Sequence, residues 1–206
     1  FAGIESAYVS CVYNPKAESA EKFAIQHRIE NYTDSLEELT MLTDAVYIAS
    51  LHETHYEYAK YMLNNKKHVL CEKPAVLKKA QAEELYNLAK ENNVVFMEAV
   101  KTAYCPGFHA MMAAAKSGKI GRIIDVEAAF SRLTPVNTRE YMAQDYNGSF
   151  LEFGSYVCMP VFELLGCDYD DVRFHSMRAV NGVDAYTKAV FSFGGKSAEV
   201  KTGLGV

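Results

Sequence analysis

Residues 67–99 read KHVLCEKPAVLKKAQAEELYNLAKENNVVFMEA, and this stretch decides the fold. Its two short apolar runs, Lys67–Cys71 and Val94–Ala99, are typical of buried strands. Between them, Lys78–Glu91 places apolar side chains at spacings of three and four, the pattern of an amphipathic helix. Because neighbouring parallel strands need a long crossover connection, the stretch predicts a strand–helix–strand unit of a parallel sheet.

The same alternation extends toward the N-terminus. Helical spacing is found in Lys16–His27 and in His55–Leu63. A short helix is predicted after Ser35, which stands three residues before Glu38 as in a capping box. We therefore predict four strands separated by helices: Ala7–Tyr13, Asp44–Ser50, Lys67–Cys71 and Val94–Ala99.

The pattern changes after Pro106. Helices are predicted over Phe108–Ala115, ending at Gly118, and over Tyr156–Leu165. The remaining runs read as strands without regular helical crossovers: Ile123–Phe130, Asp171–Arg178 and Tyr186–Phe193. The predicted fold class is α/β, with a partial Rossmann-type, doubly wound parallel sheet followed by an α+β domain with a mostly antiparallel sheet. We place the two domains at residues 1–120 and 121–206.

Composition excludes several classes of protein. Half of the 206 residues are hydrophobic and the formal net charge is −5, which is the balance of a globular chain and not of a disordered one. No block of Lys and Arg and no run of about 18 apolar residues occurs, so neither nucleic acid nor a membrane is an expected partner. The five cysteines lack a CxxC pair, which predicts buried free thiols, no metal site and a reducing cytoplasm.

Lys73 carries the sharpest chemical signal, because it follows a predicted strand and precedes Pro74. Ligands of open α/β sheets bind beyond the carboxyl ends of the strands. Lys73 therefore either points into a ligand crevice or is a solvated residue of a turn. The same rule draws attention to the other residues that directly follow strands, at Asn14, Ser50 to His52 and Glu72 to Pro74.

Several strings resemble one family of oxidoreductases. Residues 67–75 (KHVLCEKPA), 94–99 (VVFMEA) and 117–122 (SGKIGR) are similar to the Gfo/Idh/MocA family, which includes glucose-fructose oxidoreductase and inositol dehydrogenase. Residues 147–156 (NGSFLEFGSY) resemble its GGGxLxDxGxH segment, so the resemblance runs over nearly the whole chain. It implies that Lys73, the lysine of the EKP motif, contacts a substrate hydroxyl beside the nicotinamide and assists its proton transfer.

In the last segment, Glu152 stands at the family's usual Asp and Tyr156 at its usual His. Tyrosine there is characteristic of the dihydrodiol and sugar dehydrogenase branch, so the resemblance makes Tyr156 the second catalytic candidate. A tyrosine with an ordinary pKa of about 10 needs a neighbouring cation to act near neutral pH, and Lys73 is the expected neighbour. The alternatives are an aromatic packed against the core for Tyr156, and a capping or orienting carboxylate for Glu152.

The expected cofactor is NADP or NAD. The turn Asn14-Pro15-Lys16 offers no acid for the ribose 2′-OH that NAD presents, which favours NADP. By resemblance, residues 50–55 match the family's cofactor loop, where His55 is either a ligand or the cap of the next helix. Ala103 stands where an Arg is common, a role that Lys101 is expected to take. The predicted cofactor-binding residues are Asn14, Ser50, Leu51, His52, His55, Glu72, Lys73 and Pro74.

The leading functional prediction is an NAD(P)-dependent oxidoreductase acting on a small molecule. It would move a hydride between the nicotinamide and a secondary alcohol or ketone of a sugar, polyol or cyclic diol. Two alternatives stay open: a non-redox use of bound NAD, as in glycoside cleavage, and a module that binds a nucleotide or sugar without turnover.

Two further expectations concern the whole protein. No GxGxxG turn occurs, and the chain runs from Phe1 to a strand-like end, so we expect it to be the middle of a longer two-domain enzyme. Apolar side chains of the second domain are expected to share one sheet face, forming either a homo-oligomer surface or an intramolecular core: Val126, Phe130, Phe191 and Phe193.

Overall fold

The structure, a computed structural model, describes residues 5–141 and 147–205. Its contacts divide the chain into two compact units. Unit 1 consists of Phe1–Ser50, Thr54–Cys71 and Lys78–Met97, and unit 2 of Leu51–Glu53, Glu72–Leu77 and Glu98–Val206. This grouping changes near Met97, whereas the domain boundary between residues 120 and 121 stays a prediction.

Unit 1 alternates strands and helices. Its elements are β1 (Cys11–Tyr13), α1 (Ala17–His27), β2 (Asn31–Thr33), α2 (Leu36–Leu42), β3 (Ala45–Ile48), α3 (His52–Asn64), β4 (His68–Cys71), α4 (Lys79–Glu91) and β5 (Phe96–Glu98). β1 pairs with β2 in parallel, and β3 pairs with β4 in parallel, with β5 next to β4. The predicted parallel first sheet is thus confirmed.

One strand of unit 1 was not predicted, and the strand over Lys196–Gly203 in unit 2 was noted only as a strand-like end of the chain. The segment Asn31–Thr33 forms β2, where the sequence predicted only the approach to a helix cap. The sequence pattern does not indicate this strand, because its polar residues also serve the following turn. Thr33 Oγ1, for example, accepts the backbone N–H of Ser35. The Ser35 cap itself is confirmed, since Ser35 Oγ accepts the backbone N–H of Glu38 at 3.3 Å, while the Glu38 carboxylate bonds to Thr33.

Helices α3 and α4 lie side by side in unit 1. Lys60 Nζ lies 2.6 Å from Glu84 Oε1, and the Tyr56 hydroxyl donates to the same carboxylate. The α3 helix begins at His52, three residues earlier than its apolar pattern predicts, because the polar residues of its first turn carry no hydrophobic periodicity.

Unit 2 is built on a four-stranded sheet. Its elements are η1 (Lys101–Tyr104), α5 (Pro106–Lys116), β6 (Asp125–Ser131), η2 (Arg139–Tyr141), α6 (Ser149–Leu165), β7 (Asp171–Arg178), β8 (Asp184–Phe193) and β9 (Lys196–Gly203). The order β6-β9-β8-β7 has one parallel pair, β6 with β9, and two antiparallel pairs. This confirms the mostly antiparallel second sheet.

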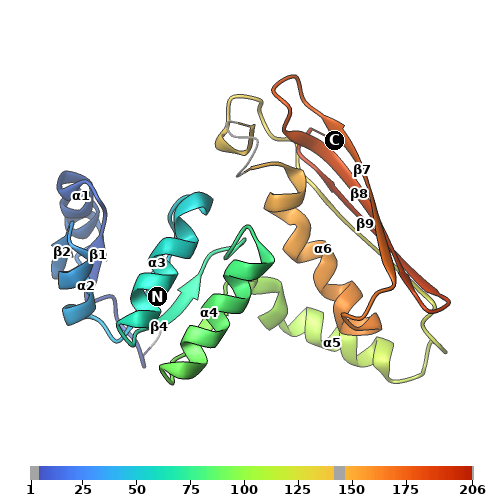
Figure 1. Ribbon diagram of the computed structural model, residues 1–206, viewed down its shortest axis with the longest axis horizontal. Helices are drawn as coiled ribbons and strands as arrows, with labels where there is room; N and C mark the ends of the chain where they lie inside the picture. The colour runs from blue at the N-terminus through green and yellow to red at the C-terminus, as the bar shows by residue number, and fades with distance from the viewer. Residues whose placement is uncertain (1–4, 142–146, 206) are drawn as a thin grey trace. The chain divides into compact units, whose positions relative to one another are not determined.

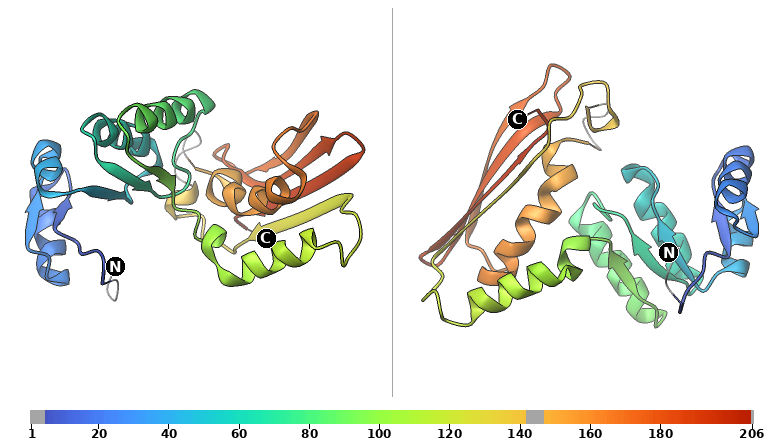
Figure 2. Two further views of the ribbon diagram at one scale, coloured as in Figure 1. Left: turned by 90° about the horizontal axis from the view of Figure 1, so that it is seen from below. Right: turned by 180° about the vertical axis from the view of Figure 1, so that it is seen from behind.

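Helix α6 lies along one face of this sheet, as three views show (Figures 1 and 2). Val126, Phe191 and Phe193 pack there with Val157 and Val161 of the helix in one buried cluster. The intramolecular-core interpretation of these sheet residues is therefore the right one. Phe130, the fourth member of the predicted set, contacts the rings of Phe153 and Tyr156 on α6.

The start of α6 is fixed by a glycine and a carboxylate. Gly148 precedes the helix with φ 130°, and a Cβ built on it would lie 1.8 Å from Asp184 Oδ1. Oδ2 of Asp184 accepts from Ser149 Oγ at 2.7 Å and from the backbone N–H of Phe150 at 3.0 Å. Only glycine fits this approach, so the sequence of the turn sets the first residue of the helix.

The cysteine prediction is partly wrong. Cys11 and Cys71 are buried free thiols, as predicted, but Cys105 and Cys167 are free and exposed. Cys158 is intermediate, and burial raises its pKa to about 11. Apolar neighbours in sequence therefore do not decide burial, because alternate faces of an element meet different surroundings.

Candidate functional site

Lys73 lies in the segment that follows β4, and this segment belongs to unit 2 together with α6. The backbone of the segment is held on both sides of the lysine. The N–H of Lys73 donates to Glu72 Oε2 at 3.2 Å, and the N–H of Ala75 donates to Glu98 Oε1 at 3.0 Å. The Lys73–Pro74 peptide bond is cis. Because Lys73 is only 8% exposed, the solvated-turn alternative is wrong.

The Lys73 ammonium group is bound by a single residue of α6. Nζ donates to the Glu152 carboxylate oxygen Oε1 at 2.8 Å and to the Glu152 main-chain carbonyl at 3.1 Å. Both side chains are 9% exposed, so the ion pair is buried. An ammonium group has three N–H donors, and two of them go to residue 152, which leaves the third for a ligand.

Of the two structural roles considered for Glu152, capping and orienting, these contacts support the orienting role toward Lys73. The capping alternative is wrong, because Asp184 accepts the backbone N–H of Phe150 at the start of α6, whereas the Glu152 carboxylate binds Lys73. Within the described part of the chain, Oε2 of Glu152 is buried and has no hydrogen bond. Two basic side chains also lie within 4 Å of Oε2, through His52 Nε2 at 3.8 Å and the Arg139 guanidinium at 3.9 Å.

Tyr156 stands one helical turn after Glu152, beside the same lysine. Lys73 Nζ lies 5.8 Å from the centre of its ring, which also packs edge-on against Phe130. Burial raises the pKa of Tyr156, and the carboxylates of Glu72, Glu152 and Glu98 raise it further. The expected lowering by Lys73 is not found. The direction of this shift favours the protonated phenol, which can donate a hydrogen bond or a proton.

A cavity of about 270 Å³ opens beside Tyr156 in unit 2. Lys101 and Thr102 line it from η1, Ala128 and Phe130 from β6, and Tyr156 from α6. Lys101, expected from the sequence to replace a missing Arg, thus shares a cavity with the tyrosine. The space suits a small molecule whose polar groups face a lysine and a phenol.

His55 and Ser50 form a local contact of unit 1. His55 is fully buried, and its Nε2 lies 3.1 Å from the Ser50 carbonyl, which can only accept, so Nε2 is the donor. Thr54 Oγ1 donates to Ser50 Oγ at 2.7 Å. These bonds fasten the turn between β3 and α3. They do not cap the helix, because His55 donates to a carbonyl and accepts no N–H of the first turn in this contact. Leu51, next along this turn, is 54% exposed.

Asn14 ends β1 in unit 1 and shapes the turn into α1. Its side-chain Oδ1 accepts the backbone N–H of Lys16 at 2.9 Å, and its own N–H donates to the Thr33 carbonyl at 3.2 Å. This side chain holds its own turn, a usual role of asparagine before a helix. Lys16 is exposed beside it.

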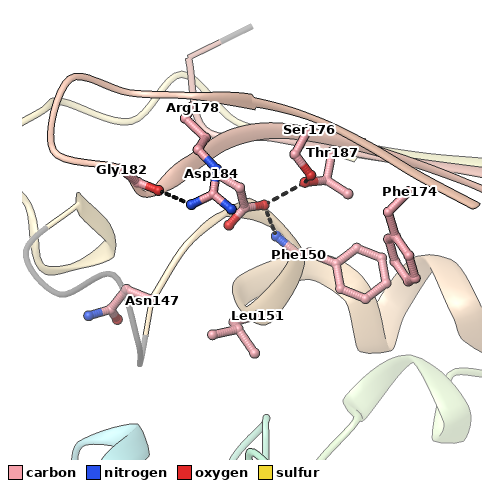
Figure 3. Close-up of a pocket in the computed structure, with 9 residues that line it drawn as sticks. All are labelled: Asn147, Phe150, Leu151, Phe174, Ser176, Arg178, Gly182, Asp184 and Thr187. Carbon is pink, nitrogen blue, oxygen red and sulfur yellow. Dashed lines mark hydrogen bonds between the residues drawn. The ribbon is translucent and has the colours of Figure 1, made fainter.

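A second hollow of about 310 Å³ lies where α6 begins, against β7 and β8 (Figure 3). Phe150 and Phe174 meet edge to face at one end, 5.4 Å between ring centres, and Arg178 donates to the Gly182 carbonyl at the other. Asp184 lies between them and is occupied by the bonds that anchor α6. The residues that line this hollow thus anchor the start of α6, the helix that carries Glu152 and Tyr156.

The sequence analysis missed two contributors. Arg139 lies in η2 within a segment without any motif, so nothing in the sequence indicates that it approaches Glu152. Glu98 ends β5 and was marked only as part of a stretch, although it holds the lysine segment through Ala75. Each contact joins residues far apart in the chain, and periodicity reports only local neighbours.

The described residues form neither a metal site nor a membrane-spanning helix. Within residues 5–141 and 147–205, no group of three or more His, Cys, Asp or Glu side chains is placed to hold a metal ion. No helix in that part of the chain is long and apolar enough to cross a membrane.

Parallel strands that alternate with helices define the α/β class of protein, whose ligands bind beyond the carboxyl ends of the strands. Residues 3–100 match the model of an oxidoreductase family with an NAD-binding Rossmann fold, GFO_IDH_MocA. The first half of the chain thus matches the Gfo/Idh/MocA family, which confirms the resemblance seen in the sequence.

Individual relatives agree with that assignment. The chain is 34% identical to scyllo-inositol 2-dehydrogenase (NADP(+)) IolU of Bacillus subtilis, over 96% of this chain and 62% of that protein. It is 29% identical to trans-1,2-dihydrobenzene-1,2-diol dehydrogenase of Xenopus laevis, over 87% of this chain and 55% of the relative. It therefore spans roughly three-fifths of the relatives' length.

A solved structure shows the same fold. KijD10, a 3-ketoreductase from Actinomadura kijaniata in complex with TDP-benzene and NADP, superposes with a TM-score of 0.82 at 23% identity. The superposition covers 99% of this chain and 63% of that one.

Proposed function

We propose that the protein is an NAD(P)-dependent oxidoreductase that interconverts a secondary alcohol and a ketone on a sugar, polyol or cyclic diol. The observation that carries the proposal is the buried Lys73–Glu152 pair with Tyr156 beside it. Burial of an ion pair costs free energy, and a tyrosine with a shifted pKa beside a cavity marks a candidate functional site. The family and the named relatives supply the reaction class.

The chemistry of the side chains fits a dinucleotide. After β1, the turn at Asn14 presents an amide and the exposed Lys16 and no carboxylate, which suits the 2′-phosphate of NADP. We propose that Ser50, Leu51, His52 and His55 after β3, and Glu72, Lys73 and Pro74 after β4, line the cofactor site. The bound nicotinamide supplies or accepts the hydride.

Two side chains handle the proton in this proposal. The free N–H of Lys73 donates to the oxygen of the reacting carbon, and Glu152 fixes the direction of that bond. Tyr156, protonated because its pKa is raised, donates to the same oxygen or to a neighbouring one. For ketone reduction, Lys73 or Tyr156 gives a proton to the oxygen of the reacting carbon and is left deprotonated. Alcohol oxidation is the reverse step, in which the deprotonated group accepts the hydroxyl proton.

The test is turnover by the full-length protein with a panel of substrates. The panel contains scyllo-inositol and trans-1,2-dihydrobenzene-1,2-diol, each with NADP and with NAD, and the reduced nicotinamide is followed by absorbance. We expect reduced cofactor to accumulate in step with ketone product, at lower KM for NADP than for NAD. A product formed without net reduced cofactor would instead favour non-redox use of bound NAD, and tight cofactor binding without any product would favour a binding module.

Two coarser features of the protein belong to the proposal. The free thiols at all five cysteines suit a reducing cytoplasm, which fractionation of the source cells tests. A homo-oligomer through the second sheet would use the face away from α6, where Lys188, Glu199 and Lys201 form ion pairs. Light scattering of the full-length protein, at low and high salt, tests that assembly.

A further inference from the structure

The two oxygens of the Glu152 carboxylate have unequal surroundings. Oε1 accepts from Lys73, while Oε2 is buried and has no hydrogen bond within the described residues. A buried acceptor left without a donor is unfavourable, so native structures rarely keep one without a reason. The carboxylate can also rotate about its terminal bond, and rotation would change the direction of the Lys73 ammonium group.

Two groups lie at ion-pair distance from Oε2. His52 Nε2 is 3.8 Å away, and the side chain of His52 is only 4% exposed. The Arg139 guanidinium is 3.9 Å away, but its side chain is 50% exposed, so water screens it. Of the two groups, His52 is therefore the one whose interaction with Oε2 water screens less. At 3.8 Å the contact is longer than a hydrogen bond, as contacts in ligand-free sites often are before the ligand tightens them.

We propose that His52 is a positioning residue: its Nε2 holds Oε2 of Glu152, so that Oε1 keeps Lys73 Nζ aimed at the reacting oxygen. His52 is the first residue of α3 and lies in the same compact unit as Lys73 and Glu152. The inference rests on the proposed function, because it assigns a role in that reaction. In the cofactor loop proposed above, His52 would then contribute its main chain, while its imidazole contacts the carboxylate and not the dinucleotide.

The test compares two substitutions in the full-length protein. Gln can place its amide nitrogen where Nε2 stands and donate to Oε2, whereas Leu fills similar space without a donor. We expect His52→Leu to lower kcat on the order of 100-fold, the cost of a small misplacement of a catalytic group, with cofactor Kd within about threefold. We expect His52→Gln to keep kcat within about threefold of wild type.

Other outcomes overturn the inference. Equal loss of kcat in His52→Leu and His52→Gln would mean that the donor at this position does not matter. A raised cofactor Kd with unchanged kcat would mean that His52 contacts the cofactor directly. His175→Leu is the matched control, because His175 is exposed on β7, and its kcat should equal that of wild type.

Thermal unfolding separates this inference from the proposed function. The single variants His52→Leu and Glu152→Leu and the double variant are melted without substrate. We expect the loss of Tm in the double variant to be smaller than the sum of the single losses by about 2 °C or more, since the residues interact. Additive losses overturn the inference whatever the turnover. Non-additive losses in a protein without hydride transfer would support the contact and reject the proposed function alone.

Discussion

Two groups of the same composition, each a lysine, a glutamate and a tyrosine, occur in very different surroundings. On α3 and α4, Lys60 lies 2.6 Å from Glu84, and these side chains are 38% and 40% exposed. Tyr56 bonds to both members of the pair. Water solvates both charges at this exposure, so such exposed pairs contribute little to stability.

The second group has nearly the same contact distance but is buried. Lys73 lies 2.8 Å from Glu152, and both side chains are 9% exposed, with the Tyr156 ring beside the ammonium. Contact distance therefore does not distinguish a site from a surface pair, whereas burial does. Desolvation makes the second pair expensive, and the functional role proposed for Lys73 gives a reason to retain it.

The largest expected effect tests whether chemistry follows the buried group. Replacing Lys73 by Met should lower kcat about 1000-fold, because the residue is proposed to handle the proton, with cofactor Kd nearly unchanged. Steady-state kinetics and fluorescence titration of NADPH measure the two quantities. Lys60→Met, the matched change in the exposed group, should leave kcat as it is. Equal kcat in wild type and Lys73→Met would break the comparison.

A stability experiment sharpens the same contrast. Glu152→Met leaves the buried ammonium group without its counter-charge and should lower the free energy of unfolding by about 3 kcal/mol. The double variant Lys73→Met with Glu152→Met removes both charges and should recover most of that loss while remaining inactive. Urea unfolding followed by circular dichroism measures both. A double variant as unstable as the single one would show that the pair is there to stabilise the fold.

A smaller effect is expected at the two tyrosines. Tyr156→Phe should lower kcat about 10- to 100-fold through loss of the phenolic donor, and Tyr56→Phe should not change it. The folded-state pKa of Tyr156 lies above its unfolded value, so its contribution to stability is present below pH about 10 and is lost as pH rises through the folded pKa. Tm measured from pH 8 to 11 should therefore fall less in Tyr156→Phe than in wild type. An identical alkaline fall in both proteins would contradict this.

The smallest effect belongs to the exposed pair. Lys60→Met should change Tm by no more than about 2 °C, because solvent and salt already weaken the interaction with Glu84. The change is checked by thermal melts at low and high salt, and the Glu84→Gln variant should behave in the same way. A drop as large as that of Glu152→Met would show that exposure does not separate the two groups.

Most of the fold follows from local patterns. The strands β3 and β4 and the helix α4 were predicted nearly to their ends, because their sequences carry continuous apolar runs or one regular apolar stripe. Lys73 was found because it follows a strand end and belongs to a recognisable string. The three-residue strand β2 was missed, since its side chains also serve the turn that follows.

The organisation around Lys73 could not be predicted in the same way. The roles of Glu152 and His52 depend on a meeting of residues about 80 and 100 positions apart, which periodicity does not report. The sequence analysis expected Lys73 to lower the pKa of Tyr156, and that direction was wrong. Lys73 does lie beside the ring, but it is bound by Glu152, which was not foreseen. Charge on a side chain is visible in a sequence, but the partner that neutralises it is not.

The grip of the main chain on Lys73 has a consequence for genetics. Besides the carboxylate, the carbonyl oxygen of residue 152 accepts from Nζ at 3.1 Å, and every amino acid at that position carries this carbonyl. A mutational scan of position 152 therefore tests the side-chain bond to Lys73 but not the main-chain bond. Tolerated substitutions there would understate the importance of the position. The position of this carbonyl depends on where α6 begins, at Gly148. A substitution at Gly148 would therefore disturb the main-chain bond to Lys73.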